Sequence, residues 1–552
     1  MENAPRNYHL LVVSDLHVSE GRGARNKKFP ENEDFFFDEE FARFLAFHQD
    51  ARRWSGAKWH LVVNGDLFDF LQVIETDDAS AARSAVPESH DRGLPCGELE
   101  TVRKLRKIAE GHWLLFEALS GFVASGNVLT VIKGNHDVEF HYPGVREAFR
   151  DELRSAFRRR IDRDPAWGTG KEIERVGVDA VRFSDWFHYE RDLLWIEHGN
   201  RYEGFNSFKY WLSPLLPGIP GWPPGRRDEI DLPFGSLFVR YLFNKVETVE
   251  PFADNIKPAS RFVRWLIRNH PVTALGFLFT DGWRMLDRIR RAWADVSPEA
   301  WEIRRRQHED RLRELAGRSG IEPATLKELD NLRARSLLKE PGGREKVLRF
   351  VLRPWIFLPA VALAALAVLL SVLYASAIIL GPVIPGTVRA ILLDPFVRLV
   401  RTVAPWAALA VMLAAFVVIL RWLLTEEEGR GPSYLKDRAE RIAERLDVRY
   451  VIMGHTHDAE LHPIGMGGAR ENEYFNTGTW TTVFSEEERL LRKPVEFVFV
   501  QGVRKEGGMA LRLFEWNDGA GEPRLLKLFR GIRQPLPRNR RDADGIAKSA
   551  EK

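Results

Sequence analysis

Short runs of apolar and β-branched residues recur along the chain and alternate with stretches in which apolar residues have helical spacing. The short runs are typical of buried strands, because each ends at glycine or a polar residue. They lie at 8–14, 58–63, 127–132, 193–197 and 450–453, with further candidates at 474–480, 495–500 and 510–514. The longer stretches predict helices at 38–50, 99–124 and 434–445. Strands that alternate with helices predict a layered α/β core.

The segment 201–447 interrupts this alternation and splits the core. Its first part, 201–349, is rich in Trp, Phe and Arg and predicts a helical insertion that acts as a lid or lies at a membrane interface. The alternative is an ordinary helical insertion with a solvated basic face. Within 350–425, the runs 355–380 and 404–420 carry no charge, and about 20 apolar residues are enough to cross a bilayer. We therefore predict a two-helix membrane hairpin, with a pair of buried core helices as the alternative.

These boundaries divide the chain into a discontinuous core and three other segments. The core has a first part at 1–200 and a second part at 430–532. The helical insertion, 201–349, and the hairpin, 350–425, lie between the two parts. The final segment, 533–552, is basic, contains proline and has few apolar residues, so we predict that it is disordered.

Composition narrows the functional classes. The chain has 552 residues and a net charge of +3, which gives no global basic field, so nucleic acid is not an expected partner. Cys96 is the single cysteine. One cysteine excludes an internal disulfide framework and a cysteine-based zinc site.

Polar motifs follow five of the predicted strands, at the point where each strand ends. They are 15–17 (DLH), 65–69 (GDLFD), 134–137 (GNHD), 198–200 (HGN) and 454–457 (GHTH). In open α/β sheets, ligands gather at the carboxyl ends of the strands. Oxygen and imidazole ligands together suit Mn, Fe, Zn or Ni better than Mg or Ca. A single motif of this length is weak evidence, but five in order at strand ends are specific.

The order D-x-H, G-D-x-x-D, G-N-H-D, H and G-H-x-H resembles the calcineurin-like metallophosphoesterase superfamily, over about residues 8–200 and 447–515. The resemblance implies an α/β fold: a four-layer α/β/β/α metallophosphoesterase sandwich, here with a large helical insertion that contains the transmembrane hairpin. It also implies two divalent transition-metal ions at one edge of the sheets, with Mn expected first and Fe, Zn and Ni left open.

The resemblance also assigns roles to individual residues. Asp15, His17 and His457 would hold the first metal, Asn135, His198 and His455 would hold the second, and Asp66 would bridge both. A hydroxide that bridges the metals would attack phosphorus opposite the leaving group.

Two further residues match catalytic positions of the family. His136 resembles its general acid, and Asp69 matches the carboxylate that orients this histidine. A helix N-cap is the alternative role for Asp69. Asn476 matches a structural Asn-x-Gly turn.

One position departs from a branch of the superfamily. Protein serine/threonine phosphatases carry Arg directly after the GDxxD motif, whereas this chain has Phe70. The chain is nearest in character to the UDP-2,3-diacylglucosamine pyrophosphatases, which place a helical lid between the HG and GHTH motifs. It has a longer insertion, and it has GNHD where that branch typically has GNRD.

We therefore expect a metal-dependent phosphoesterase: a membrane-anchored dinuclear phosphohydrolase. It would cleave a phosphoester or pyrophosphate bond of a lipid-linked or membrane-adjacent substrate. One alternative is a phosphodiesterase for soluble or cyclic nucleotides, with the hairpin only as an anchor. The other is a non-catalytic membrane scaffold. The expected partners are the lipid bilayer and a phosphorylated lipid-linked or small-molecule substrate. Small residues in the hairpin also fit a homodimer, or packing of its two helices on each other.

The position of the site residues predicts a topology. Both flanks of the hairpin contribute site residues, so both must lie on the same side of the membrane. Residues 1–7 have no apolar signal core, which places that side in the cytoplasm. We expect a multi-pass protein of a bacterial inner membrane with a cytoplasmic catalytic domain.

Overall fold

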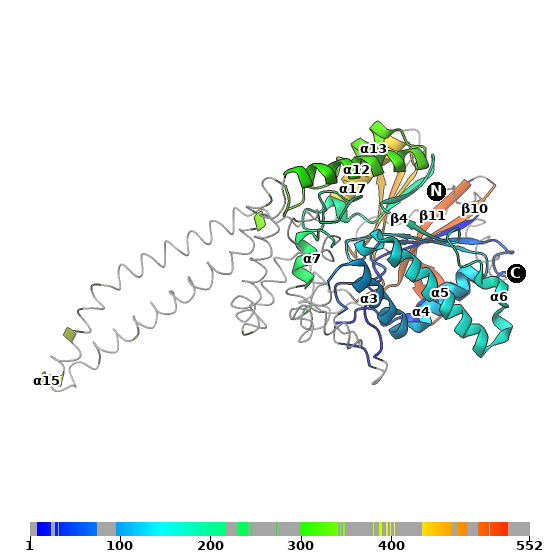
Figure 1. The fold of residues 1–552 in the computed structure, drawn as a ribbon, viewed down its shortest axis with the longest axis horizontal. Helices are drawn as coiled ribbons and strands as arrows, with labels where there is room; N and C mark the ends of the chain where they lie inside the picture. The colour runs from blue at the N-terminus through cyan, green and yellow to red at the C-terminus, as the bar shows by residue number, and fades with distance from the viewer. Residues whose placement is uncertain are drawn as a thin grey trace.

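The computed structural model describes most of the predicted core and parts of the insertion (Figure 1). The described residues are 8–23, 28–30, 32–73, 95–216, 229–240, 298–340, 433–465, 472–482, 495–506 and 508–527, with isolated residues and short pieces between 244 and 402.

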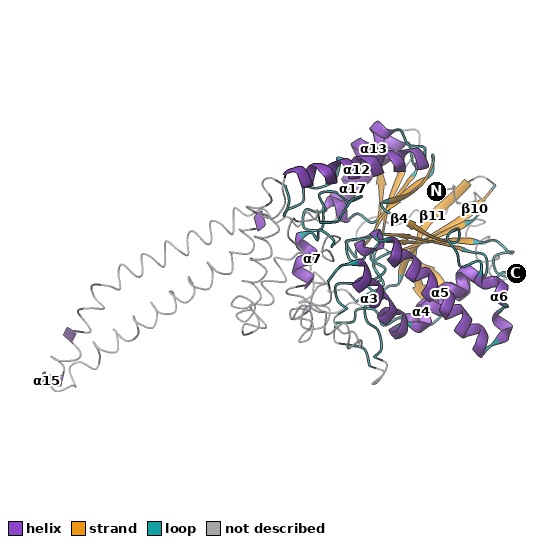
Figure 2. Cartoon of the chain, viewed as in Figure 1, coloured by secondary structure: helices purple, strands orange, loops and turns teal. Residues whose placement is uncertain are grey.

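The described residues form a mixed α/β fold with two mixed β-sheets (Figure 2). The seven-stranded sheet has the order β12-β11-β10-β1-β2-β3-β4, and β1 to β4 are parallel. Its strands are β1 (His9–Val13), β2 (Trp59–Asn64), β3 (Val128–Ile132), β4 (Val181–Ser184), β10 (Val498–Lys505), β11 (Gly508–Asn517) and β12 (Glu522–Leu525). The predicted strands at 8–14, 58–63 and 127–132 are confirmed as β1, β2 and β3.

The five-stranded sheet has the order β5-β6-β7-β9-β8, with β6, β7 and β9 parallel. Its strands are β5 (Phe187–Glu190), β6 (Leu194–Glu197), β7 (Tyr450–Met453), β8 (Ala459–Ile464) and β9 (Asn472–Thr477). Strand β6 precedes the insertion and β7 follows it, yet the two strands pair in parallel register. The two flanks of the insertion therefore belong to one folded core.

Successive side chains of a strand point to opposite faces of the sheet, so the apolar residues of β1 fall into two separate clusters. Leu10 and Val12 of β1 share one cluster with Ile196 of β6 and Ile452 of β7, so this face of the first sheet packs toward the second sheet. Leu11 and Val13 belong to another cluster, together with side chains of the neighbouring helices. In Figure 1 the strands lie between α12, α13 and α17 on one side and α3, α4 and α5 on the other.

Most helices of the core lie on the outer face of the seven-stranded sheet. They are α1 (Asp38–Gln49), α3 (Glu98–Gly111), α4 (Trp113–Ala124), α5 (Pro143–Arg163) and α6 (Gly170–Ile173), with short 3-10 turns η1 (Val138–His141) and η2 (Pro165–Trp167). A third 3-10 turn, η3 (Asn200–Tyr202), follows β6 of the other sheet and contacts α17. Helix α17 (Ser433–Leu446) contacts β7, β8 and β9 of the other sheet. The remaining helices, α7 (Phe234–Phe238), α12 (Pro298–Ser319), α13 (Pro323–Asp330) and α15 (Gly386–Val388), belong to the part of the chain between β6 and β7.

The predicted single helix at 99–124 is wrong, because α3 ends at Gly111 and α4 begins at Trp113. At the break the backbone passes so close to another segment that a Cβ on Gly111 would lie 2.1 Å from the carbonyl oxygen of Glu20. The side chain of His112 is buried between Glu33 and Asp38. Apolar periodicity runs through both helices, but these contacts interrupt the helix.

The membrane predictions need correction. The predicted hairpin, 350–425, lies outside the described residues apart from isolated residues and short pieces, as does the predicted disordered tail, 533–552. Across the described ranges, no helix is long and apolar enough to span a bilayer. This finding contradicts the prediction of a multi-pass membrane protein with a cytoplasmic catalytic domain, and we withdraw that prediction.

Candidate metal centre

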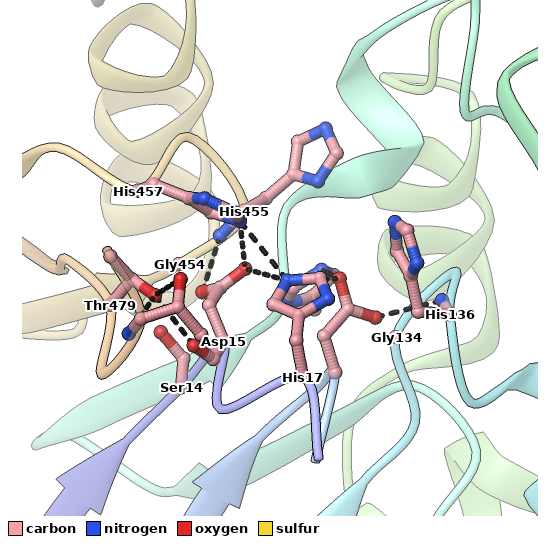
Figure 3. A network of polar contacts seen from close by, with 12 residues as sticks. Ser14, Asp15, His17, Gly134, His136, Gly454, His455, His457 and Thr479 are labelled. Atoms are coloured by element: carbon pink, nitrogen blue, oxygen red, sulfur yellow. Dashed lines mark hydrogen bonds and ion pairs between the residues drawn. The ribbon is translucent and has the colours of Figure 1, made fainter. Parts of the chain in front are cut away.

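The polar motifs meet where the parallel strands of both sheets end. Asp15 and His17 follow β1, Asp66 follows β2, and Asn135 and His136 follow β3. In the other sheet, His198 follows β6, and His455 and His457 follow β7. Figure 3 shows side chains from these loops gathered around Asp15 and His17. The structure therefore places the predicted site residues of both flanks in one region.

Several site residues have a left-handed backbone conformation, which is unfavourable for residues other than glycine. They are Asp15 (φ 54°), His17 (φ 50°), Asp66 (φ 51°), His455 (φ 71°) and His457 (φ 62°). This conformation costs about 1–2 kcal/mol per residue. Hydrogen bonds between the loops hold it, since the backbone N–H groups of Leu16 and His17 both donate to the carbonyl oxygen of Asp66 at 3.0 Å. Strain that the surroundings maintain in this way is concentrated at functional sites.

Two glycines allow the loops to approach the carboxylates. A Cβ on Gly134 would lie 2.0 Å from Oδ1 of Asp66, and a Cβ on Gly454 would lie 2.6 Å from Oδ2 of Asp15. Any side chain at either position would displace one of these carboxylates. The glycines of the GNHD and GHTH motifs therefore serve the geometry of the site.

The first cluster consists of Asp15, His17 and His457, all buried. Nε2 of His17 lies 3.1 Å from Nε2 of His457, and Oδ1 of Asp15 lies 3.3 Å from the latter and 3.8 Å from the former. Ligands at right angles around a metal ion, with bonds of about 2.1 Å, are about 3 Å apart. Two imidazole nitrogens and a carboxylate oxygen at these distances fit a transition-metal ion.

The second cluster consists of Asp66, His198 and His455. Nδ1 of His198 hydrogen-bonds the carbonyl oxygen of Asn64 at 2.9 Å, which leaves Nε2 as the nitrogen for a metal. This Nε2 lies 2.9 Å from Oδ2 of Asp66, and the same oxygen lies 3.9 Å from Nε2 of His17 in the first cluster. Asp66 therefore stands between the two clusters.

Asn135 supplies a further test of whether a metal fits. The residue lies between Gly134 and His136, and it is buried. Among the described residues its side-chain oxygen Oδ1 has no hydrogen-bond partner. A buried acceptor without a donor costs about 1–3 kcal/mol, and a cation would satisfy it. The unsatisfied oxygen of Asn135 is therefore consistent with a metal ion bound at this position.

The charges of the site favour ionised carboxylates. Burial alone would raise the pKa of Asp66, but the neighbouring His198 and His136 outweigh burial and lower it. For Asp15, too, His198 and His17 overcome burial and hold the pKa well below its usual range. Burial lowers the pKa of His198, but Asp66 and Asp15 raise it to about 9. Because a metal binds the deprotonated imidazole, loading would release this proton.

His136 and Asp69 form a separate pair beside the clusters. Nδ1 of His136 hydrogen-bonds Oδ2 of Asp69, while Oδ1 of Asp69 accepts the backbone N–H groups of Leu71 at 3.0 Å and Gln72 at 3.2 Å. Asp69 thus holds Nδ1 of His136 and also caps a turn, where the alternative expected from the sequence was a helix N-cap. Although burial lowers the pKa of His136, Asp69 and Asp66 raise it above the usual value. The His136 side chain is 15% exposed, so it can reach a substrate.

Two residues near the site had no role in the sequence interpretation. Asp137 accepts the backbone N–H of Gly134 at 2.6 Å and that of Leu67 at 2.8 Å, and thereby ties the loops after β2 and β3 together. Its place beside His136 in the GNHD motif could have signalled this. Glu203 lies 2.7 Å from Nε2 of His455. No spacing in the sequence links these two residues, which are 252 positions apart.

The structure also shows the surroundings of Phe70 and Asn476. Phe70 is buried against the rings of Phe68 and Phe140, and it contributes to the core where the protein phosphatases carry Arg. Nδ2 of Asn476 donates to the carbonyl oxygen of Gly454 at 3.0 Å, so Asn476 supports the GHTH turn.

Comparison with known proteins gives no assignment. No family model matches the chain, and no curated protein matches it either.

Proposed function

We propose that this protein is a two-metal phosphoester hydrolase of the calcineurin-like metallophosphoesterase type. One observation carries the proposal: Asp66 stands between an Asp-His-His cluster and a pair of histidines at the ends of parallel strands. A carboxylate shared by two groups of nitrogen and oxygen ligands is the donor set that a dinuclear centre requires. Phosphoryl transfer is the reaction that such a centre serves in many phosphatases and nucleases.

The packing of the layers supports the same assignment. Apolar residues of β1 and β2 in one sheet cluster with those of β6 and β7 in the other, and helices cover the outer faces. This arrangement agrees with a four-layer α/β/β/α sandwich. The site then lies at one edge of the sandwich, where strands of both sheets end.

The residues divide into two metal sites. Asp15, His17 and His457 would hold one ion, Asn135, His198 and His455 would hold the other, and Asp66 would contact both. Mixed oxygen and imidazole donors fit Mn, Fe, Zn or Ni. When bound, the two ions would lower the pKa of a water nucleophile and neutralise charge on the phosphoryl group.

The chain supplies the proton for the leaving group. In hydrolysis the bond between phosphorus and the leaving oxygen breaks, and that oxygen must gain a proton. His136 is held through Nδ1 by Asp69, which leaves Nε2 as the nitrogen that donates this proton. Burial lowers the pKa of His136, but Asp69 and Asp66 outweigh burial and raise it, which favours the protonated ring that a general acid requires.

The test is metal-dependent hydrolysis of p-nitrophenyl phosphate and bis(p-nitrophenyl) phosphate by the full chain. We expect turnover with Mn²⁺, no turnover after treatment with a chelator, and a loss of about 10³-fold or more in kcat for Asp66→Asn. Asp38→Asn is the matched control, because Asp38 also contacts a histidine but lies at His112, outside the centre. Turnover that survives chelation, or an Asp66→Asn variant as active as the control, would contradict the proposal.

A further inference from the structure

Glu203 contacts a predicted metal ligand from the part of the chain that splits the core. We propose that Glu203 is a positioning residue, which fixes the tautomer and ring orientation of His455 and links the insertion to the metal centre. This inference rests on the proposed function, since it assigns Glu203 a role at the same two-metal site.

The contact determines which nitrogen of His455 faces a metal. Oε2 of Glu203 lies 2.7 Å from Nε2 of His455. An ionised carboxylate only accepts hydrogen bonds, so Nε2 must carry the hydrogen and Nδ1 keeps the lone pair. A metal-bound histidine commonly donates its other N–H to a carboxylate or a carbonyl group, which raises the basicity of the ligating nitrogen.

His198, the other histidine of the second cluster, is held in the complementary way. Its Nδ1 faces the carbonyl oxygen of Asn64, and its Nε2 faces Asp66. Each histidine of this cluster therefore has one nitrogen fixed by an acceptor of the protein. In the described part of the chain, the side chains close enough together to share an ion include His198 and His455 but not Glu203. The geometry thus favours support of a ligand over direct ligation.

The Glu203 side chain is itself fixed by the turn that follows η3. Nδ2 of Asn206 donates to Oε2 of Glu203 at 2.9 Å, the oxygen that contacts His455. The backbone N–H of Glu203 donates to the carbonyl oxygen of Asn200 at 3.2 Å, and that of Asn206 donates to the carbonyl oxygen of Glu203 at 3.1 Å. These bonds hold a side chain that is 33% exposed in a single position.

Residues of the insertion anchor this turn. The carbonyl oxygen of Arg201 accepts the N–H of Ala334 at 2.8 Å, and that of Gly204 accepts the N–H of Leu337 at 3.3 Å. The guanidinium of Arg201 also pairs with the carboxylate of Asp330, at the end of α13. The insertion therefore determines where Glu203 lies, which gives its described part a role at the metal centre.

The experiment titrates the metal-free full chain with Mn²⁺ by calorimetry, for wild type, Glu203→Ala and Glu203→Gln. For Glu203→Ala we expect one of the two ions to bind about 10–100-fold more weakly, with the other unchanged. Glu203→Gln keeps an acceptor but loses the charge, so its loss should be intermediate. Visible absorption of the Co²⁺-loaded proteins should change in the same order, because the ligand field depends on how His455 is held. Glu302→Gln is the matched control, since Glu302 is an exposed carboxylate of α12 that pairs with arginines.

The outcomes separate this inference from the proposed function. If wild type binds two ions and both variants bind them with wild-type affinity and spectra, the role of Glu203 is overturned and the proposed function stands. If wild type binds fewer than two ions, the proposed function fails and the role of Glu203 fails with it. If Glu203→Ala does not fold, Glu203→Gln decides, because wild-type affinity in that variant overturns the role.

Discussion

Two buried clusters of the described residues bring histidine and carboxylates together, the candidate metal centre and a cluster around His112, and they differ in their surroundings. At the candidate centre, His17 lies near Asp15, Asp66 and Asp69. In the His112 cluster, beside the break between α3 and α4, Nε2 of His112 lies 3.3 Å from Oε2 of Glu33, and Nδ1 lies 3.0 Å from Oδ2 of Asp38. By residue type and burial the two are alike.

They differ in what their carboxylates contact and in the backbone that surrounds them. The Glu33 carboxylate accepts the backbone N–H groups of Ser19 at 3.1 Å, Gly21 at 2.7 Å and Phe35 at 3.0 Å, so it stabilises the local chain. At the candidate centre, left-handed residues bring several loops together and Oδ1 of Asn135 has no partner among the described residues. Converging strand ends and backbone strain therefore set the candidate centre apart from the His112 cluster.

The largest expected difference is in catalysis. His136→Gln should lower kcat by about 10²–10⁴-fold, because the leaving group loses its proton donor. The free energy of unfolding should change less than in His112→Asn, because the Gln side chain can still donate a hydrogen bond to the buried Asp69 and position 136 is partly exposed. Initial rates with a phosphoester of poor leaving group, measured beside urea unfolding, check both statements. A variant with wild-type kcat would remove His136 from the mechanism.

A smaller effect, on stability and not on catalysis, is expected in the His112 cluster. His112→Asn should lower the free energy of unfolding by about 3 kcal/mol, because it leaves buried carboxylates without their cation. The kcat per folded molecule should stay at the wild-type value. Urea unfolding and active-site titration on the same sample measure the two quantities. Loss of kcat with unchanged stability would place His112 in the reaction and abolish the distinction between the clusters.

The smallest effect concerns pH. Burial lowers the pKa of His112, but Glu33 and Asp38 outweigh it and raise the pKa to about 10, above the unfolded value of about 6.5. A raised pKa stabilises the fold fully below the unfolded value, and this stabilisation is lost as pH rises toward 10. The stability difference between wild type and His112→Asn should therefore shrink between pH 6.5 and pH 10. A difference that stays constant across this range would show that His112 is neutral in the fold.

The strand ends and their motifs were predictable from sequence because they depend on local order. A buried strand followed by glycine and a polar residue defines Asp66 or His455 without knowledge of distant contacts. The break at His112 was missed because Gly111 meets Glu20 through tertiary packing, while apolar periodicity continues across the break. Strands β4 and β8 were missed because their alternation is short and partly polar.

The contact of Glu203 with His455 depends on long-range structure. Backbone hydrogen bonds from Ala334 and Leu337 anchor the turn that carries Glu203, and no sequence motif predicts that arrangement. The apolar runs at 355–380 and 404–420 lie outside the described residues apart from isolated positions, so the structure does not describe the helices that their composition predicts. Among the residues that the structure describes, no helix is long and apolar enough to cross a bilayer.

The count of bound metal ions tests the central claim most directly. The full chain, Asp66→Asn and His112→Asn would each be equilibrated with Mn²⁺, freed of excess metal and analysed by inductively coupled plasma mass spectrometry. We predict two ions per chain in wild type and in His112→Asn, and fewer than two in Asp66→Asn, which loses the shared carboxylate. A wild type with no bound metal, or an Asp66→Asn variant with two ions at wild-type affinity, would contradict the account.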